Sequence, residues 1–267
     1  MSDEHGDRMK AYEAAWETRL DARLPIYARI DGRSFSRFTA GMRRPFDPAM
    51  SAAMIATAGG LVERTHARIA YTQSDEISLL FLAGRPESDV LFGGRLQKLA
   101  SVLASLSTAL FTARLMSQDE LAPYRNRLPH FDCRVCQLPS QTEAANMLVW
   151  RYKDARKNAI AMAAQALFSA SELFGRDGGA MLAMLRGRGV DFEAYPDWFK
   201  HGTFVRRRTV ARELSAAELA RIPEKYRPSG AVARSETVTL ACDFRKCTNR
   251  EAFVFDGAAP QFAEEAS

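Results

Sequence analysis

The sequence predicts an α+β fold whose first part is a ferredoxin-like βαββαβ domain. Short apolar segments bounded by turn-forming residues indicate four strands. Two longer apolar segments have the length and spacing of helices. Their order along the chain is strand, helix, strand, strand, helix, strand, which is the split βαβ arrangement. The predicted strands are residues 25–30, 69–71, 77–81 and 131–138, and the predicted helices are residues 49–66 and 92–116.

The first predicted strand ends in polar residues. A short amphipathic helix is predicted before it, at residues 9–20, because apolar side chains recur three and four positions apart. Asp31 and Gly32 follow the strand, and glycine permits a backbone turn that other residues resist. Backbone amides of Gly32–Ser36, with the hydroxyls of Ser34 and Ser36, could then cradle phosphates.

The second and third strands are joined by a polar turn at Gln73–Asp75, so Asp75 and Glu76 lie at a hairpin tip. An acidic tip of this kind is commonly just a solvated turn. In the βαββαβ arrangement, however, the first and third strands are central neighbours, so Asp31 is expected to meet Asp75. Paired carboxylates hold divalent cations, and two-metal sites keep their ions about 3.5–4 Å apart.

The helix at 92–116 carries Arg95 and Lys98 one turn apart near its start. Positive charge there opposes the helix dipole, so either an anion lies nearby or the two side chains are a solvated pair.

The remainder of the chain is predicted to be helical, with a small β component. Residues 141–174 read as a helix in which Arg151, Asp154 and Asn158 share one face, either as a polar binding surface or as an intrahelical ion pair. A short helix near 180–185 and strands at 203–210 and 236–243 follow. The predicted organisation is a catalytic domain at residues 1–140, with a helical and basic region at 141–267 that packs on it as one unit.

Charge favours a polyanionic partner. The chain of 267 residues has a net charge of +5 and a pI of about 9.1. Residues 200–250 contain 12 Lys or Arg against 5 Asp or Glu, a local balance of +7 that includes Arg206 and Arg207. This region suits RNA or DNA, although a solvated charged surface is equally consistent with charge alone. No run of 18 apolar residues exists and the N-terminus is acidic, so no membrane partner and a cytoplasmic location are expected.

The four cysteines do not form a zinc pattern. Cys133 and Cys136 lie in an alternating segment, where residues three apart face opposite sides of a sheet. Cys242 and Cys247 are five apart without knuckle glycines. Reduced thiols are favoured over structural zinc.

Taken together, these motifs resemble the tRNA-histidine guanylyltransferase family over residues 9–168, and less clearly at His201–Gly202–Thr203. The motifs that carry the resemblance are Arg29–Phe35, Arg44–Asp47, Tyr71–Ser78, Arg95–Lys98, Phe131–Arg134, and Trp150–Arg151 with Asp154 and Asn158.

The resemblance implies a polymerase-like palm that extends tRNA from its 5′ end in the 3′ to 5′ direction, after activation of that end with ATP or GTP. It implies that two Mg²⁺ ions are held by Asp31, Asp75 and the Gly32 carbonyl, with Glu76 in support as the third catalytic acid. It also implies a homodimer or homotetramer. The implied nucleotide-binding residues are Asp31, Gly32, Arg33, Ser34, Phe35, Ser36, Arg44, Asp47, Ser74, Asp75, Arg95 and Lys98.

One motif departs from the family. Where the eukaryotic enzymes have a His-Ile-Asn-Asn run, this chain has Arg156–Lys157–Asn158–Ala159 and keeps only Asn158. This looks like the branch that repairs 5′-truncated tRNAs, with Arg151, Asp154, Lys157, Asn158, Arg206 and Arg207 as implied RNA contacts. A nucleotide cyclase or forward polymerase on the same palm, or a non-catalytic RNA-binding module, are the alternatives.

Overall fold

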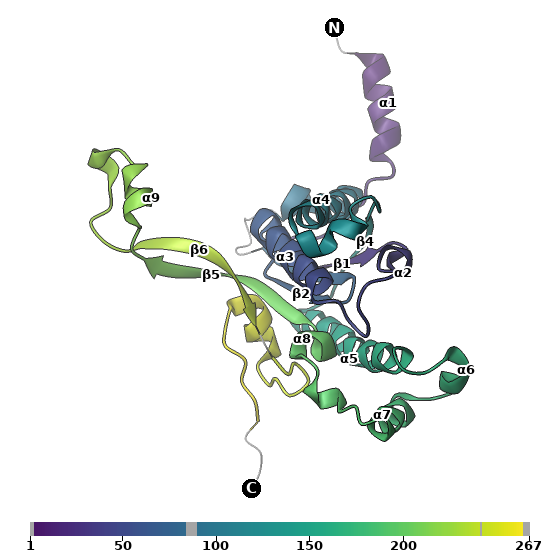
Figure 1. Cartoon of the computed structure of the whole chain (residues 1–267). Coiled ribbons are helices and arrows are strands. Elements are labelled where there is room, and N and C mark those ends of the chain that lie inside the picture. Colours follow the sequence, from purple (N-terminus) through teal and green to yellow (C-terminus); the bar gives the residue numbers. More distant parts are fainter. Residues whose placement is uncertain (1–2, 84–89, 241, 264–267) are drawn as a thin grey trace.

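The computed structural model describes residues 3–83, 90–240 and 242–263, and its centre is an antiparallel sheet of six strands (Figure 1). The strand order is β4-β1-β3-β2-β5-β6. Its first four strands, in the order 4-1-3-2, are the ferredoxin-like arrangement, so the α+β prediction is confirmed. The strands are β1 (Ile26–Gly32), β2 (Ile69–Gln73), β3 (Glu76–Phe81), β4 (Phe131–Gln137), β5 (Thr203–Arg212) and β6 (Val232–Leu240).

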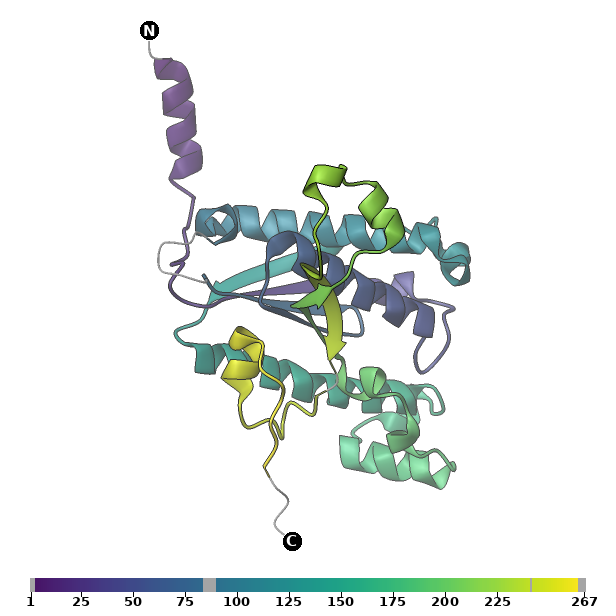
Figure 2. The same cartoon turned by 90° about the vertical axis from the view of Figure 1, so that its left-hand side faces the viewer.

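Helices cover both faces of this sheet (Figure 2). Alternate residues of a strand face opposite sides, and β1 follows this rule: Ile30 packs with α3 (Pro48–Thr65) and α4 (Leu96–Ser117), whereas Tyr27 packs with α5 (Gln141–Gln165). The sheet therefore has two hydrophobic cores. The shorter helices are α1 (Glu4–Ala14), α2 (Phe35–Phe38), α6 (Ala170–Leu173), α7 (Gly178–Gly187), α8 (Asp197–His201) and α9 (Ala216–Ala220).

Among the described helices, α4 is long and apolar enough, by length and composition, to cross a membrane. A helix that packs against a sheet in a protein core has the same length and apolar composition as a membrane span. In this structure Leu103 and Phe111 of α4 are fully buried in the core formed with α3 and the sheet.

The C-terminal part of the chain extends the same sheet. β5 pairs with β2 at Thr203–Val205, and β5 and β6 continue as a two-stranded arm that carries α9 at its end (Figure 1). The segment from α6 to α8 forms a small helical lobe on the end of α5, with its own hydrophobic cluster around Phe192 and Phe199. The boundary near residue 140 stays a prediction.

Two predicted helices differ from the structure. The first helix spans Glu4–Ala14, instead of 9–20, because Asp3 caps its N-terminus by accepting a hydrogen bond from the Gly6 amide. It has no buried residue, and Trp16 beyond it is 79% exposed, so its apolar positions do not pack on the sheet. The helix predicted at 141–174 ends at Gln165, and Ser169 caps the separate helix α6.

The predicted alternation at Cys133 and Cys136 is seen in β4. Cys133 is partly buried against the α3–α4 core, whereas Cys136 is exposed on the other face of β4. All four cysteines are free thiols. Within the described residues, no group of three His, Cys, Asp or Glu side chains is arranged to hold a metal ion.

Candidate active site

The structure brings Asp31 and Asp75 together at one end of the sheet. Asp31 lies directly opposite Glu76 in the β1–β3 register. The next residue, Gly32, donates its backbone amide to the Asp75 carbonyl at 3.1 Å. The two strand ends are therefore tied to each other by backbone, which places two carboxylates beside the β2–β3 turn.

The acids repel one another in this arrangement. Burial raises the pKa of Asp75, and the negative charge of Asp31 raises it further. Burial also raises the pKa of Glu76, while hydrogen bonds from Arg151 oppose that rise. A pair of half-buried like charges is costly for the fold, and a bound cation would remove that cost.

Asp132 is an acid near the site that the sequence analysis did not include among the catalytic residues. It lies opposite Asp31 in the β1–β4 register, so one row across three strands carries Asp132, Asp31 and Glu76. Its proximity depends on which residue of β4 faces β1, and that register is visible only in the structure. The predicted motif Phe131–Arg134 was its only signal.

The turn after β1 forms differently from the prediction. Ser34, with φ of 56°, adopts the left-handed conformation that had been expected of Gly32. Gly32 is needed for another reason: a Cβ on it would lie 2.4 Å from the Phe35 ring. Ser74, in the β2–β3 turn, is also left-handed, with φ of 50°. Strained serines on both sides of the acid pair are typical of a functional site.

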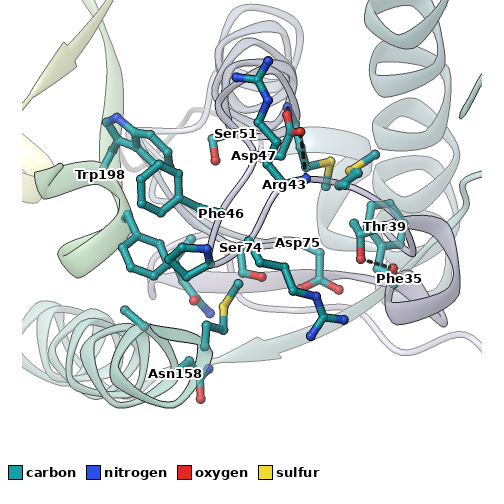
Figure 3. Close-up of a pocket in the computed structure, with 18 of the residues that line it drawn as sticks. Phe35, Thr39, Arg43, Phe46, Asp47, Ser51, Ser74, Asp75, Asn158 and Trp198 are labelled. Atoms are coloured by element: carbon teal, nitrogen blue, oxygen red, sulfur yellow. Dashed lines mark hydrogen bonds between the residues drawn. The ribbon is translucent and has the colours of Figure 1, made fainter. Parts of the chain in front are cut away.

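A cavity of about 410 Å³ opens beside Asp75, a volume within the range of small-molecule sites (Figure 3). Figure 3 shows Asp75 and Ser74 between Phe35 on one side and Phe46 on the other. The predicted nucleotide- or RNA-binding residues that line this cavity are Phe35, Ser36, Arg44, Asp47, Ser74, Asp75 and Asn158.

Two of these residues also have structural roles. The Asp47 carboxylate caps α3 by accepting hydrogen bonds from the amides of Ala49 and Met50, at 3.0 and 3.1 Å. Phe35 is 3% exposed, and its ring packs in an aromatic cluster with Phe131. Ser36 and Arg44 are exposed on the lining of the cavity, whereas Arg33 and Ser34 are exposed but do not line it.

Arg95 and Lys98 lie far from the acids. Thr108, ten residues after Lys98, is the part of α4 that reaches the acid end, because its hydroxyl accepts a hydrogen bond from the Phe131 amide opposite Gly32. Ten helical residues span roughly 15 Å. Within this chain Arg95 instead lies 3.4 Å from Glu17, and Lys98 lies over the ring of Phe92.

The expected polar surface at Arg151 is largely internal. Arg151 is 6% exposed, and its guanidinium binds both carboxylate oxygens of Glu76 at 2.7 and 2.6 Å. It also reaches Asp154 at 3.1 Å. Arg151 is therefore a buried ion-pair partner, not a surface cation, whereas Lys157 and Asn158 are exposed. The predicted intrahelical ion pair exists, but its main partner is Glu76 of β3.

The basic arm is partly committed to internal contacts. Arg206 donates hydrogen bonds to the carbonyls of Phe253 and Ala258, each at 3.0 Å, and burial lowers its pKa. Arg208 binds Glu236 across the β5–β6 pair at 2.9 Å. Arg207 is exposed on this arm, as is the ion-paired Arg208, so both present charge to solvent whereas Arg206 is committed to internal contacts.

The His201–Gly202–Thr203 segment is constrained by close packing. His201 stacks on Tyr152 with ring centroids 5.3 Å apart, and its carbonyl accepts a hydrogen bond from the Tyr71 hydroxyl at 2.6 Å. At Gly202, with φ of 74°, a Cβ would lie 2.6 Å from the Thr72 carbonyl oxygen. This glycine allows α8 to turn directly into β5.

Burial lowers the pKa of His201 below its usual 6.5, which predicts a pH dependence of stability. Below pH 6.5 the unfolded chain binds a proton at this residue more readily than the folded chain does. The free energy of unfolding therefore falls as the pH falls, by at most about 1.4 kcal/mol per pH unit for one proton. Urea unfolding at pH 7.5 and 5.5 should show a smaller loss for His201→Gln than for the wild type. Equal losses in the two proteins would contradict this assignment.

Comparison with known proteins assigns this chain to a family. The sequence model of the tRNAHis guanylyltransferases matches residues 6–139, which include β1, the acid-tipped hairpin and β4. The chain belongs to the tRNAHis guanylyltransferase family. Members of this family are nucleotidyltransferases, so the chain is an enzyme of that class.

Solved structures of this family share the fold. A bacterial tRNAHis guanylyltransferase-like protein in complex with ATP is 37% identical, with a TM-score of 0.71 over 76% of this chain and 86% of that chain. A bacterial protein of the same description in complex with GTP is 32% identical, with a TM-score of 0.69 over 91% of this chain and 92% of that chain. The tRNAHis guanylyltransferase of Saccharomyces cerevisiae is 26% identical, with a TM-score of 0.61 over 72% of this chain and 90% of that chain.

Proposed function

We propose that this member of the tRNAHis guanylyltransferase family adds nucleotides to the 5′ end of tRNA in the 3′ to 5′ direction, directed by the opposite strand. The observation that carries the proposal is the meeting of Asp31 and Asp75 beside a cavity lined by Ser36, Arg44 and Ser74. Carboxylates beside a cavity that also carries hydroxyls and an arginine suit phosphoryl transfer, in which catalysis is largely positioning and charge stabilisation.

The residues present fit a magnesium site. Asp31 and Asp75 are hard oxygen donors, and their mutual repulsion favours a bound dication. The Gly32 amide points toward the turn that carries Asp75. The carbonyl of a strand residue points to the same side as its amide, so the Gly32 carbonyl oxygen can serve as a further metal ligand. Two Mg²⁺ ions, when bound, would neutralise the triphosphate and activate the attacking hydroxyl.

The chain itself would bind and orient the nucleotide. Arg44 supplies positive charge at the rim of the cavity, and the hydroxyls of Ser36 and Ser74 offer hydrogen bonds to phosphate oxygens. Phe46 and Trp198 form an aromatic wall, with ring centroids 4.9 Å apart, against which a base can pack. ATP or GTP would activate the 5′ end, and the same cavity would accept the nucleotide to be added.

Incubation with labelled GTP and 5′-monophosphorylated tRNA tests this function. Label transferred to the RNA is the expected result. A small cyclic product formed without RNA would instead indicate a cyclase, and label at the 3′ end of the RNA would indicate a forward polymerase. RNA binding with no transfer of label would indicate a non-catalytic RNA-binding module.

Substrate choice provides a prediction. Lys157 and Asn158 are exposed where the histidine-specific run would lie, and a lysine grips phosphates without reading sequence. We therefore expect a tRNA of arbitrary identity that lacks its first 5′ nucleotide to receive the Watson–Crick complement. Its kcat/KM should exceed that of intact histidine tRNA receiving one untemplated guanosine, measured with all four nucleotides present. A strong preference for guanosine on intact histidine tRNA, whatever the opposing base, would overturn this expectation.

A further inference from the structure

Within the described part of the chain, no helix covers one strip of the sheet near the acids. On the α5 side, buried residues of α5 pack against β1, β2 and β3, including Tyr27 and Leu80. The residues of the edge strand β4 that face the same side are all exposed: Asp132, Arg134 and Cys136. The strip begins beside Asp31 and runs along β4, away from the nucleotide cavity.

Two arginines face each other on this strip. Arg134 lies directly opposite Arg29 in the β1–β4 register, and like charges in that position destabilise a sheet. Nearby carboxylates compensate only weakly: Arg29 lies 4.0 Å from Glu76, which is bound to Arg151, and Arg134 lies 3.9 Å from Asp132. The Arg134 side chain is 65% exposed and that of Arg29 is 19% exposed, so an anion from solvent can reach Arg134 directly while Arg29 adds positive charge beneath it.

Trp150 adds an aromatic surface to the same place. It is 51% exposed, which is unusual for a tryptophan on a helix that packs against a sheet. The guanidinium of Arg151 lies 4.5 Å from its ring centroid, and that of Arg29 lies 5.7 Å from it. These contacts hold the ring in a fixed orientation while half of its surface stays accessible.

We propose that this Arg29–Arg134–Trp150 surface binds an unpaired RNA nucleotide next to the acid pair. The proposal rests on the function proposed above. The arginine pair would hold a phosphate and Trp150 would stack on a base, the combination by which proteins bind single strands. Arg29 and Asp31 lie two residues apart on the same face of β1, about 7 Å along the strand. A strand held on this surface therefore reaches the site of nucleotide addition.

The exposure of the surface favours RNA over free nucleotide. A free nucleotide needs an enclosing site, which the cavity beside Asp75 supplies on the other side of the acids. A tRNA is anchored at many points, so an open surface with two cations and one aromatic ring can contribute to its binding. A symmetric contact with the same surface of a second copy is disfavoured, because it would bring Arg29 and Arg134 of both copies together.

Binding of an acceptor-stem RNA hairpin that lacks its first 5′ nucleotide, measured without magnesium, tests the proposal. Trp150→Ala should weaken RNA binding roughly tenfold or more, and Trp150→Phe should retain most of the affinity because phenylalanine also stacks. Arg134→Gln should lower the slope of log affinity against log salt by about one phosphate contact. GTP affinity should stay unchanged in all three variants.

Matched controls are Trp16→Ala, which removes a tryptophan 79% exposed on the N-terminal segment, and Arg114→Gln, on exposed surface of α4. Both should bind RNA as the wild type does. Arg134 is exposed, so its variant decides the outcome even where Trp150→Ala fails to fold. An unchanged RNA affinity and salt slope for Arg134→Gln would overturn the proposal. It would also be overturned if the variants lost GTP affinity or self-association while their RNA affinity stayed the same. Nucleotide addition to tRNA by the wild type, measured alongside, tests the proposed function separately. If the wild type extends tRNA, that function stands even when the RNA-surface proposal fails.

Discussion

Replacing Asp75 by asparagine should lower the rate of nucleotide addition by about 10²-fold or more, the usual effect of losing one strong electrostatic stabiliser of a transition state. Asparagine keeps the size and the hydrogen-bonding oxygen of the side chain but removes the charge that would hold a cation beside Asp31. Single-turnover addition of labelled GTP to tRNA measures the effect. RNA affinity should be unchanged, because Asp75 lies at the nucleotide cavity.

The same variant should be at least as stable as the wild type, which separates a chemical effect from misfolding. Burial and the charge of Asp31 raise the pKa of Asp75, so its ionised form costs stability at neutral pH, and the neutral amide removes that cost. Asp119→Asn is the matched control, because its carboxylate is fully exposed on the surface. Turnover of Asp75→Asn within a few-fold of the wild type would contradict the assignment of Asp75 to the metal.

The fold could be predicted because each element has a distinct pattern. Strands β2 and β3 are short and mostly apolar, β4 alternates between buried and exposed residues, and the two helices between the strands are long, so the order of elements selects the βαββαβ topology. The N-terminal helix could not be predicted in the same way. Apolar residues such as Tyr12 and Trp16 recur at helical spacing, but spacing does not show whether a surface is available for them to pack against.

Site residues whose positions follow from where strands end could be predicted from the sequence. Residues whose roles follow from the side chains that they contact could not. Asp31 and Asp75 converge because topology alone makes β1 and β3 neighbours. Arg95 and Lys98 also belong to a recognisable sequence motif, but topology keeps them away from the acids. β3 runs away from the acidic tip, so the helix that follows it begins at the far end of the sheet. That argument was available from the sequence. The burial of Arg151 was not, because it depends on the path of α5 across the sheet.

Arg151 and Glu76 form a buried ion pair beneath the acid site, and breaking it should have a large effect on stability. Both side chains are less than 10% exposed and share two hydrogen bonds. Arg151→Met should lower the free energy of unfolding by about 3–5 kcal/mol, because buried Glu76 loses its two hydrogen bonds and keeps only the weaker attraction of Arg29 at 4.0 Å. Urea unfolding measures this, and Lys153→Met, at an exposed position of the same helix, should change stability by less than about 0.5 kcal/mol.

The double variant Glu76→Gln/Arg151→Met should recover most of the stability lost in Arg151→Met, because it removes the buried charge together with its partner. The cost of Arg151→Met alone should also depend on pH. Without the arginine, the pKa of Glu76 rises further above its usual 4.5, so the folded chain holds a proton that the unfolded chain has released. The stability of Arg151→Met therefore falls as the pH rises above 4.5, and its deficit against the wild type should be larger at pH 8 than at pH 5. A double variant as unstable as the single one, or a deficit independent of pH, would show that Arg151 stabilises the fold through packing and not through the charge of Glu76.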